Sequence, residues 1–130
     1  MKRTKLLKFR VPIFTEEYAV NVLIGTKDDV RKALVAYTQY APRTIEHNFN
    51  GRGLTYNLYP DKHPIIGVDG DLPIHIAIAT LAHEASHALA AIEKYVSMDD
   101  KSDEFHAHGI AAIMRTVLAT ILKPQLKGRR

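Results

Sequence analysis

The stretch "IHIAIATLAHEASHALAAIEKYV", residues 74–96, decides the fold because it predicts one long helix against which the rest of the chain must pack. It has no interior Gly or Pro, and Pro73 stands where proline suits a first helical turn. At 100° per residue, one set of apolar side chains falls on a single stripe: Ile74, Ile78, Leu81, Ala85, Leu89, Ile92 and Val96. We expect this stripe to face the core.

The opposite side of this helix carries two histidines, His83 and His87, and a glutamate, Glu84, directly follows the first. Histidines four residues apart reach one Zn²⁺, and a glutamate beside the first can take a proton from the water that the metal binds. The small residues Ala79 and Ala90 leave room for an ion. The pattern predicts a zinc site in an open cleft with Glu84 as the base. The alternative is two surface histidines and a solvated glutamate.

Catalytic zinc has three protein ligands and a water, so a third ligand must come from elsewhere in the chain. The chain contains no cysteine, which leaves His, Asp and Glu. Four candidates stand at the start of the next predicted helix: Asp103, Glu104, His106 and His108. We favour Glu104 as the ligand, with His108 one turn on as a supporting hydrogen-bond donor or an oxyanion stabiliser. Asp103 would serve equally well as a helix cap.

The remaining segments predict an α+β domain with the order strand, helix, strand, strand, helix, helix. A β-branched run predicts a strand over 18–26, and Thr26 then caps a helix over 27–39. Residues 41–53 read as a loop. Two short runs, 54–59 and 64–69, predict strands joined by a tight connection, and the last helix continues to Pro124.

Length and composition favour one soluble domain. With 130 residues and 46% hydrophobic residues, we expect a single domain over 1–130, with a core at about 13–122 and basic tails at 1–10 and 123–130. No apolar run is long enough for a membrane span. The first residues lack the unbroken apolar stretch of a secretory signal, because charged residues and Pro12 interrupt it. We therefore expect a cytoplasmic protein without a membrane partner. The tails carry much of the net charge of +4, but no nucleic-acid-binding module accompanies them.

Two motifs, "HEASHAL" at 83–89 and "DEFHA" at 103–107, resemble the zincin metallopeptidases of the gluzincin type, and especially small zincin-like proteins of phages and prophages. The resemblance implies a zinc metallopeptidase of the host-cell cytoplasm, with His83, His87 and Glu104 as ligands and Glu84 as base. It also implies that the free edge of one of the strands at 54–59 and 64–69 takes up a peptide or protein substrate. His108 stands where the family pattern has tyrosine.

Two other functions compete with the peptidase interpretation. One is a metal-stabilised binding or structural module whose cleft is occluded. The other is a nucleic-acid accessory protein that acts through its basic tails. Outside the two motifs, His47, His63 and His75 have no partner at ligand spacing, and we interpret them as surface or loop residues. The oligomeric state and the substrate sequence stay open.

Overall fold

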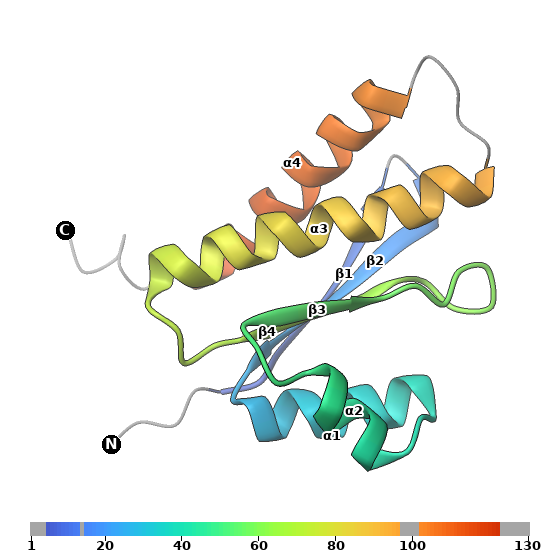
Figure 1. The fold of residues 1–130 in the computed structure, drawn as a ribbon. Helices are drawn as coiled ribbons and strands as arrows, with labels where there is room; N and C mark the ends of the chain where they lie inside the picture. Colours follow the sequence, from blue (N-terminus) through green and yellow to red (C-terminus); the bar gives the residue numbers. More distant parts are fainter. Residues whose placement is uncertain (1–4, 14, 97–101, 123–130) are drawn as a thin grey trace, which may run out of the picture.

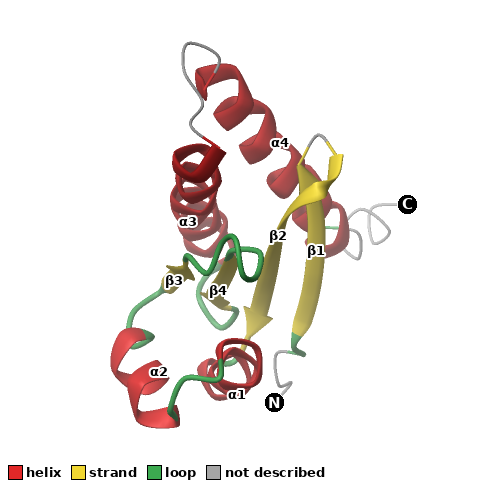
Figure 2. Cartoon of the chain, turned by 90° about the vertical axis from the view of Figure 1, so that its right-hand side faces the viewer, coloured by secondary structure: helices red, strands yellow, loops and turns green. Residues whose placement is uncertain are grey.

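The computed structural model describes residues 5–13, 15–96 and 102–122, and it shows an α+β fold as predicted. A four-stranded mixed sheet lies between two layers of helices. Helices α3 and α4 cover one face of the sheet, and α1 and α2 lie on the other (Figures 1 and 2). No helix within the described residues is both long and apolar enough to cross a membrane.

The sheet has the strand order β1-β2-β4-β3. Strands β1 and β2 are antiparallel, β2 and β4 are parallel, and β4 and β3 are antiparallel. β3 is therefore an edge strand. The bounds are β1 (Leu7–Ile13), β2 (Thr15–Gly25), β3 (Gly53–Tyr56) and β4 (Ile65–Asp69).

Strand β1 is the largest departure from the sequence prediction, which placed residues 7–10 in a basic tail. Its side chains alternate: Val11 and Ile13 are buried in the core, whereas Lys8 and Arg10 are exposed. This two-residue period is typical of a strand with one covered face. The predicted pair of strands at 54–59 and 64–69 is confirmed as β3 and β4, but the prediction of a tight connection is wrong, because the longer loop 57–64 joins them.

The first helices agree with the prediction at one element and correct it at the next. α1 (Lys27–Thr38) begins after Thr26, whose side-chain oxygen accepts a hydrogen bond from the backbone N–H of Asp29 at 3.1 Å. Residues predicted as a loop instead contain the short helix α2 (Pro42–Asn48), with proline at its first position. Burial of Ile45 and Phe49 against α1 explains why this polar segment folds.

The long helix α3 (Ile74–Val96) has the predicted bounds, and α4 (Ser102–Ile121) packs beside it (Figure 2). The middle of the predicted stripe is buried, as Leu81 and Leu89 show at 1% and 0% exposure, whereas Ile74 is 42% exposed. The two helices approach closely at Gly109. A Cβ atom there would lie 2.5 Å from Cδ2 of Leu89, so only glycine fits without a shift.

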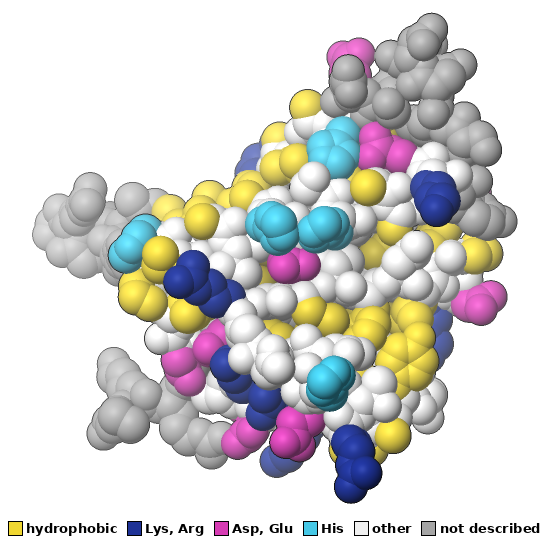
Figure 3. All heavy atoms as spheres, in the orientation of Figure 1, with side chains coloured by type: hydrophobic (Ala, Val, Ile, Leu, Met, Phe, Trp, Pro, Cys, Tyr) yellow, Lys and Arg dark blue, Asp and Glu magenta, His cyan; other side chains and the backbone are white. Residues whose placement is uncertain are grey.

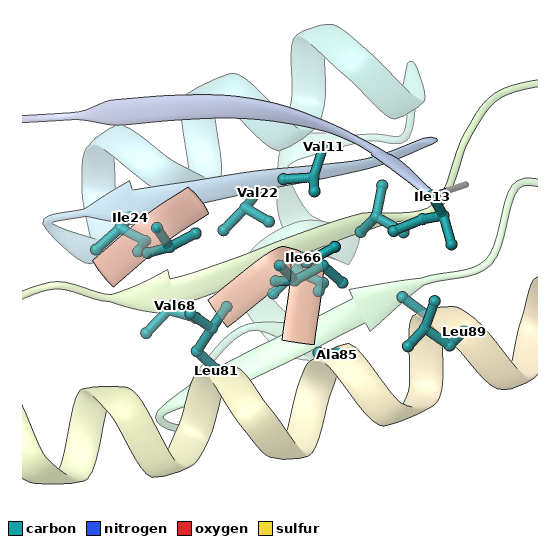
Figure 4. Close-up of a cluster of buried hydrophobic side chains, with 14 of the residues drawn as sticks. Val11, Ile13, Val22, Ile24, Ile66, Val68, Leu81, Ala85 and Leu89 are labelled. Atoms are coloured by element: carbon teal, nitrogen blue, oxygen red, sulfur yellow. The ribbon is translucent and has the colours of Figure 1, made fainter. Parts of the chain in front are cut away.

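Two apolar clusters hold the layers together. The larger fills the space between the sheet and helices α3 and α4, where Val22 and Ile66 meet Leu81 and Ala85 (Figure 4). The smaller lies on the other face, with Leu34 of α1 and Phe49 at its centre. Because α3 presents its apolar stripe to the larger cluster, the opposite side of this helix remains at the surface.

Candidate active site

The two histidines of α3 lie together at the surface. His83 and His87 are both exposed, and their Nε2 atoms are 3.2 Å apart. Figure 3 shows neighbouring histidine side chains on the face formed by α3. A tetrahedral zinc with bonds of about 2.0–2.1 Å separates two ligand nitrogens by about 3.3–3.4 Å. The same distance also suits an N–H···N hydrogen bond, but the pair already has the spacing of two zinc ligands.

Glu84 points from the histidine side of α3 towards the edge strand. Its residue exposure is 8%, and its carboxylate oxygen Oε1 accepts a hydrogen bond from the hydroxyl of Thr55 in β3 at 2.8 Å. The same hydroxyl lies 3.0 Å from the backbone oxygen of Glu84. A carboxylate held in this way has a defined position, as a general base requires.

Edge strand β3 reaches this carboxylate because its first residue has no side chain. A Cβ atom at Gly53 would lie 2.6 Å from Cγ2 of Thr80 and 3.0 Å from the backbone oxygen of Gly67. It would also lie 3.3 Å from Cγ of Glu84. Glycine thus allows the backbone of β3 to pack directly on α3.

Two hollows lie along the line where β3 meets α3, and Glu84 lines both. The first has a volume of ≈ 380 Å³ and is lined by Arg52, Gly53, Ile76, Ala79, Thr80, His83 and Glu84. The second has a volume of ≈ 460 Å³ and is lined by Thr55, Asn57, Glu84, His87, Ala90, Ala91 and Lys94. We call the two together the β3–α3 groove. His83 lines the first hollow, His87 lines the second, and Glu84 lines both.

Helix α4 meets α3 through a chain of polar contacts centred on His106. The Nδ1 atom of His106 is 2.7 Å from Oε2 of Glu93, and its Nε2 atom is 2.8 Å from Oγ of Ser86. Neither Ser86 nor Glu93 was assigned a role from the sequence. The signal was present, because seven residues are nearly two helical turns and put Ser86 and Glu93 on one side of α3.

The other candidates on α4 are placed differently. Glu104 is exposed, and it stands two positions before His106, which corresponds to about 200° around the helix axis. Glu104 therefore lies on a different side of α4 from the imidazole that contacts α3. His108 is also exposed and lies one turn on from Glu104, whereas the side chain of Asp103 lies outside the described part of the structure.

The structure thus brings together two of the predicted ligands with the predicted base, but not the third ligand. Over the described residues, no three His, Cys, Asp or Glu side chains form a group that could hold a metal ion. The donor set of His83 and His87 fits zinc at two positions. Glu104 as the third ligand and His108 as a stabiliser stay predictions.

Comparison with known proteins gives no assignment, since no family model, no curated protein and no solved structure matches the chain.

Proposed function

We propose that the protein is a zinc-dependent metallopeptidase of the zincin type, and that its natural substrate is a phage or host protein. One observation carries the proposal: the Nε2 atoms of His83 and His87 are 3.2 Å apart, and Thr55 holds the carboxylate of Glu84 on the same helix turn in place. The i, i+4 spacing of two histidines with an adjacent glutamate is the arrangement that this chemistry requires.

His83 and His87 would hold the metal, and Glu104 is the proposed third ligand from α4. When bound, Zn²⁺ lowers the pKa of a coordinated water towards about 7 and polarises a carbonyl oxygen. Both histidines are exposed, so a metal that they held would be accessible to solvent and substrate.

Glu84 acts as the proton carrier in this proposal. Its Oε1 atom is engaged by Thr55, and no hydrogen bond from a described residue occupies Oε2. Oε2 can therefore take a proton from water during attack on the peptide carbonyl and pass it to the departing amine. Because the carboxylate is mostly buried and held from β3, it keeps its position during both transfers.

Edge strand β3 supports a peptide as the substrate. Within the described sheet it pairs only with β4, so its second edge offers backbone groups to an extended chain. That edge borders the β3–α3 groove, and a peptide added there would pass Glu84 and both histidines. Hydrogen bonds from the strand backbone recognise any extended peptide, whatever its side chains.

The test compares wild-type protein with Glu84→Gln, both purified without added metal. Elemental analysis is expected to give one zinc per chain in both proteins. Hydrolysis of a fluorogenic peptide library is expected in the wild type, and to fall by about 10²–10⁴-fold in the variant, because amide cannot carry the proton. A wild-type protein without zinc, or a variant that cleaves as fast as wild type, would refute the proposal.

A metal-stabilised binding module is the competing function, and the low exposure of Glu84 favours it. In such a module the Thr55–Glu84 hydrogen bond serves only to fix β3 on α3. Glu84→Gln would then leave the biological function unchanged and zinc would still bind. A wild-type protein that holds zinc but cleaves no peptide of the library would support this module instead.

A further inference from the structure

β3 and α3, the two walls of the β3–α3 groove, run in the same direction along it. Gly53 packs on Thr80, Thr55 bonds to Glu84, and Asn57 lines the same hollow as Lys94. Residue numbers therefore rise in the same direction on both walls. A peptide that adds to β3 in antiparallel orientation, the more stable pairing, has its N-terminal part near Lys94 and its C-terminal part near Arg52.

Arg52 stands at one end of this groove with no competing charge in its hollow except Glu84. Its side chain is exposed and makes no hydrogen bond or ion pair to another described residue. Its backbone is fixed, since its carbonyl oxygen accepts a hydrogen bond from the N–H of Asp69 at 2.9 Å. The other residues that line the hollow, apart from His83 and Glu84, are small, apolar or a threonine.

We propose that Arg52 binds a carboxylate of the substrate on the C-terminal side of the bond that is cut. This inference rests on the proposed function and names its substrate class: peptides with Asp or Glu at that position, or peptides whose free C-terminus lies there. A planar guanidinium binds a carboxylate through two parallel hydrogen bonds, whereas an amide offers no matching charge. Both sources present the same chemical group, and the experiment separates them.

Binding is measured first, with zinc-loaded Glu84→Gln protein, so that no peptide is consumed. The probes are fluorescein-labelled, alanine- and serine-based peptides that carry a single Glu or Gln, each made as a free acid and as an amide. Anisotropy is expected to show about tenfold tighter binding of the carboxylate-bearing member of a pair, a typical gain for a charge-assisted hydrogen bond. A gain from Glu identifies a side-chain carboxylate, and a gain from the free acid identifies the C-terminus.

Arg52→Gln is expected to abolish this preference, and Lys94→Gln is the matched control. Lys94 is also exposed and also lines the groove, but at the end where the N-terminal part of the peptide lies. Lys94→Gln should therefore keep the preference. Equal binding of all four peptides, or a preference that survives Arg52→Gln, would overturn the inference.

Cleavage by the wild type gives a second and separable result. Mass spectrometry of the products should place the carboxylate on the C-terminal fragment. Cleavage that is equally fast for Glu and Gln peptides, and for acids and amides, overturns the role of Arg52 and leaves the peptidase intact. Carboxylate binding that depends on Arg52, without any cleavage, supports the role of Arg52 and refutes the peptidase.

Discussion

The hydroxyl of Thr55 lies 2.8 Å from Oε1 of Glu84 and 3.0 Å from the backbone oxygen of the same residue, so one side chain of β3 fixes both the carboxylate and the helix that carries it. Residues 29 positions apart in the sequence meet at this contact. It joins the predicted base to the strand proposed to bind the peptide.

Thr55→Val removes this hydroxyl with little change in shape. We expect the free energy of unfolding to fall by about 1–3 kcal/mol, because a mostly buried carboxylate oxygen loses its partner. Thr55→Ser keeps the hydroxyl and should stay near wild type. Urea unfolding measures both. In a Glu84→Met background only the contact with the backbone oxygen remains, so the effect of Thr55→Val should be smaller, and a full effect there would show that the carboxylate does not contribute.

Gly53→Ala is expected to lower the free energy of unfolding by about 1–3 kcal/mol, because the added methyl group meets Thr80 and the backbone of Gly67. Gly51→Ala is the matched control, since a Cβ atom at Gly51 meets nothing within 4 Å. Thr80→Ser removes the Cγ2 atom in the way and should rescue part of the loss. Thermal unfolding of the three variants and the double variant tests this; equal stabilities of Gly53→Ala and Gly51→Ala would contradict it.

Zinc affinity should depend on His83 and His87. We expect His83→Ala or His87→Ala to weaken zinc binding by more than the roughly 10–100-fold that loss of a supporting hydrogen bond costs. His75→Ala is the control, because His75 is an exposed histidine of the same helix outside the pair. Competition with a chromogenic chelator gives the dissociation constants. Unchanged zinc affinity in both His83→Ala and His87→Ala would refute a metal site at this pair.

The third ligand is tested by two substitutions on α4. If Glu104 completes the site, Glu104→Gln weakens zinc binding in the same competition assay and His106→Gln does not. The reverse result would transfer the role to His106, the residue of α4 that contacts α3 through Ser86 and Glu93.

His106→Gln should also loosen the packing of α4 on α3. It removes the imidazole that bridges Ser86 and Glu93, and we expect a loss of about 1 kcal/mol of stability, because the side chain of His106 is 27% exposed and solvent weakens its contact with Glu93. His75→Gln is again the control. Chemical unfolding monitored by circular dichroism gives the difference, and identical midpoints would exclude a stabilising role for the bridge.

His63 predicts an effect of pH on stability. Burial lowers the pKa of His63 below its usual 6.5, with a smaller contribution from the positive charge of Arg10, and its Nδ1 atom has no hydrogen-bond partner in the described structure. The unfolded chain therefore binds the proton more tightly, so stability falls as pH decreases from above 6.5 towards the lower folded-state pKa. His63→Gln should reduce this slope in urea titrations between neutral and acidic pH. If the pH dependence of stability were unchanged in His63→Gln, other titratable groups would be responsible for it.

Local sequence patterns correctly predicted those helices and strands whose apolar periodicity is evident within the segment itself. Helix α3 was predicted with the right bounds because its apolar period runs without Gly or Pro from Ile74 to Val96. β1 was not predicted because Lys8 and Arg10 indicated a basic tail. In the structure these two residues occupy the outward positions of an alternating strand. The parallel pairing of β2 with β4 depends on contacts between distant segments, which no local pattern encodes.

The same distinction applies to the site. The helical period alone places His83 next to His87, so the sequence predicted their proximity. The positions of Thr55 and Arg52 depend on how closely β3 packs on α3, and that distance follows from the missing side chain at Gly53. For this reason the sequence predicted a base but not the residue that holds it. The contact of His106 with α3 depends on the rotation of α4 about its axis, which the sequence leaves undetermined.

Gly109 affects the distance between α3 and α4, which any metal-ligating side chain on α4 has to span to reach His83 and His87. The side chain of Leu89 occupies the place that a side chain at this position of α4 would need, so α3 and α4 approach closely here. A methyl group at Gly109 would therefore require either Leu89 or helix α4 to shift, and a shift of α4 would change the distance from its side chains to His83 and His87. The absence of a side chain at Gly109 thus contributes to how closely the polar side chains of α4 approach α3.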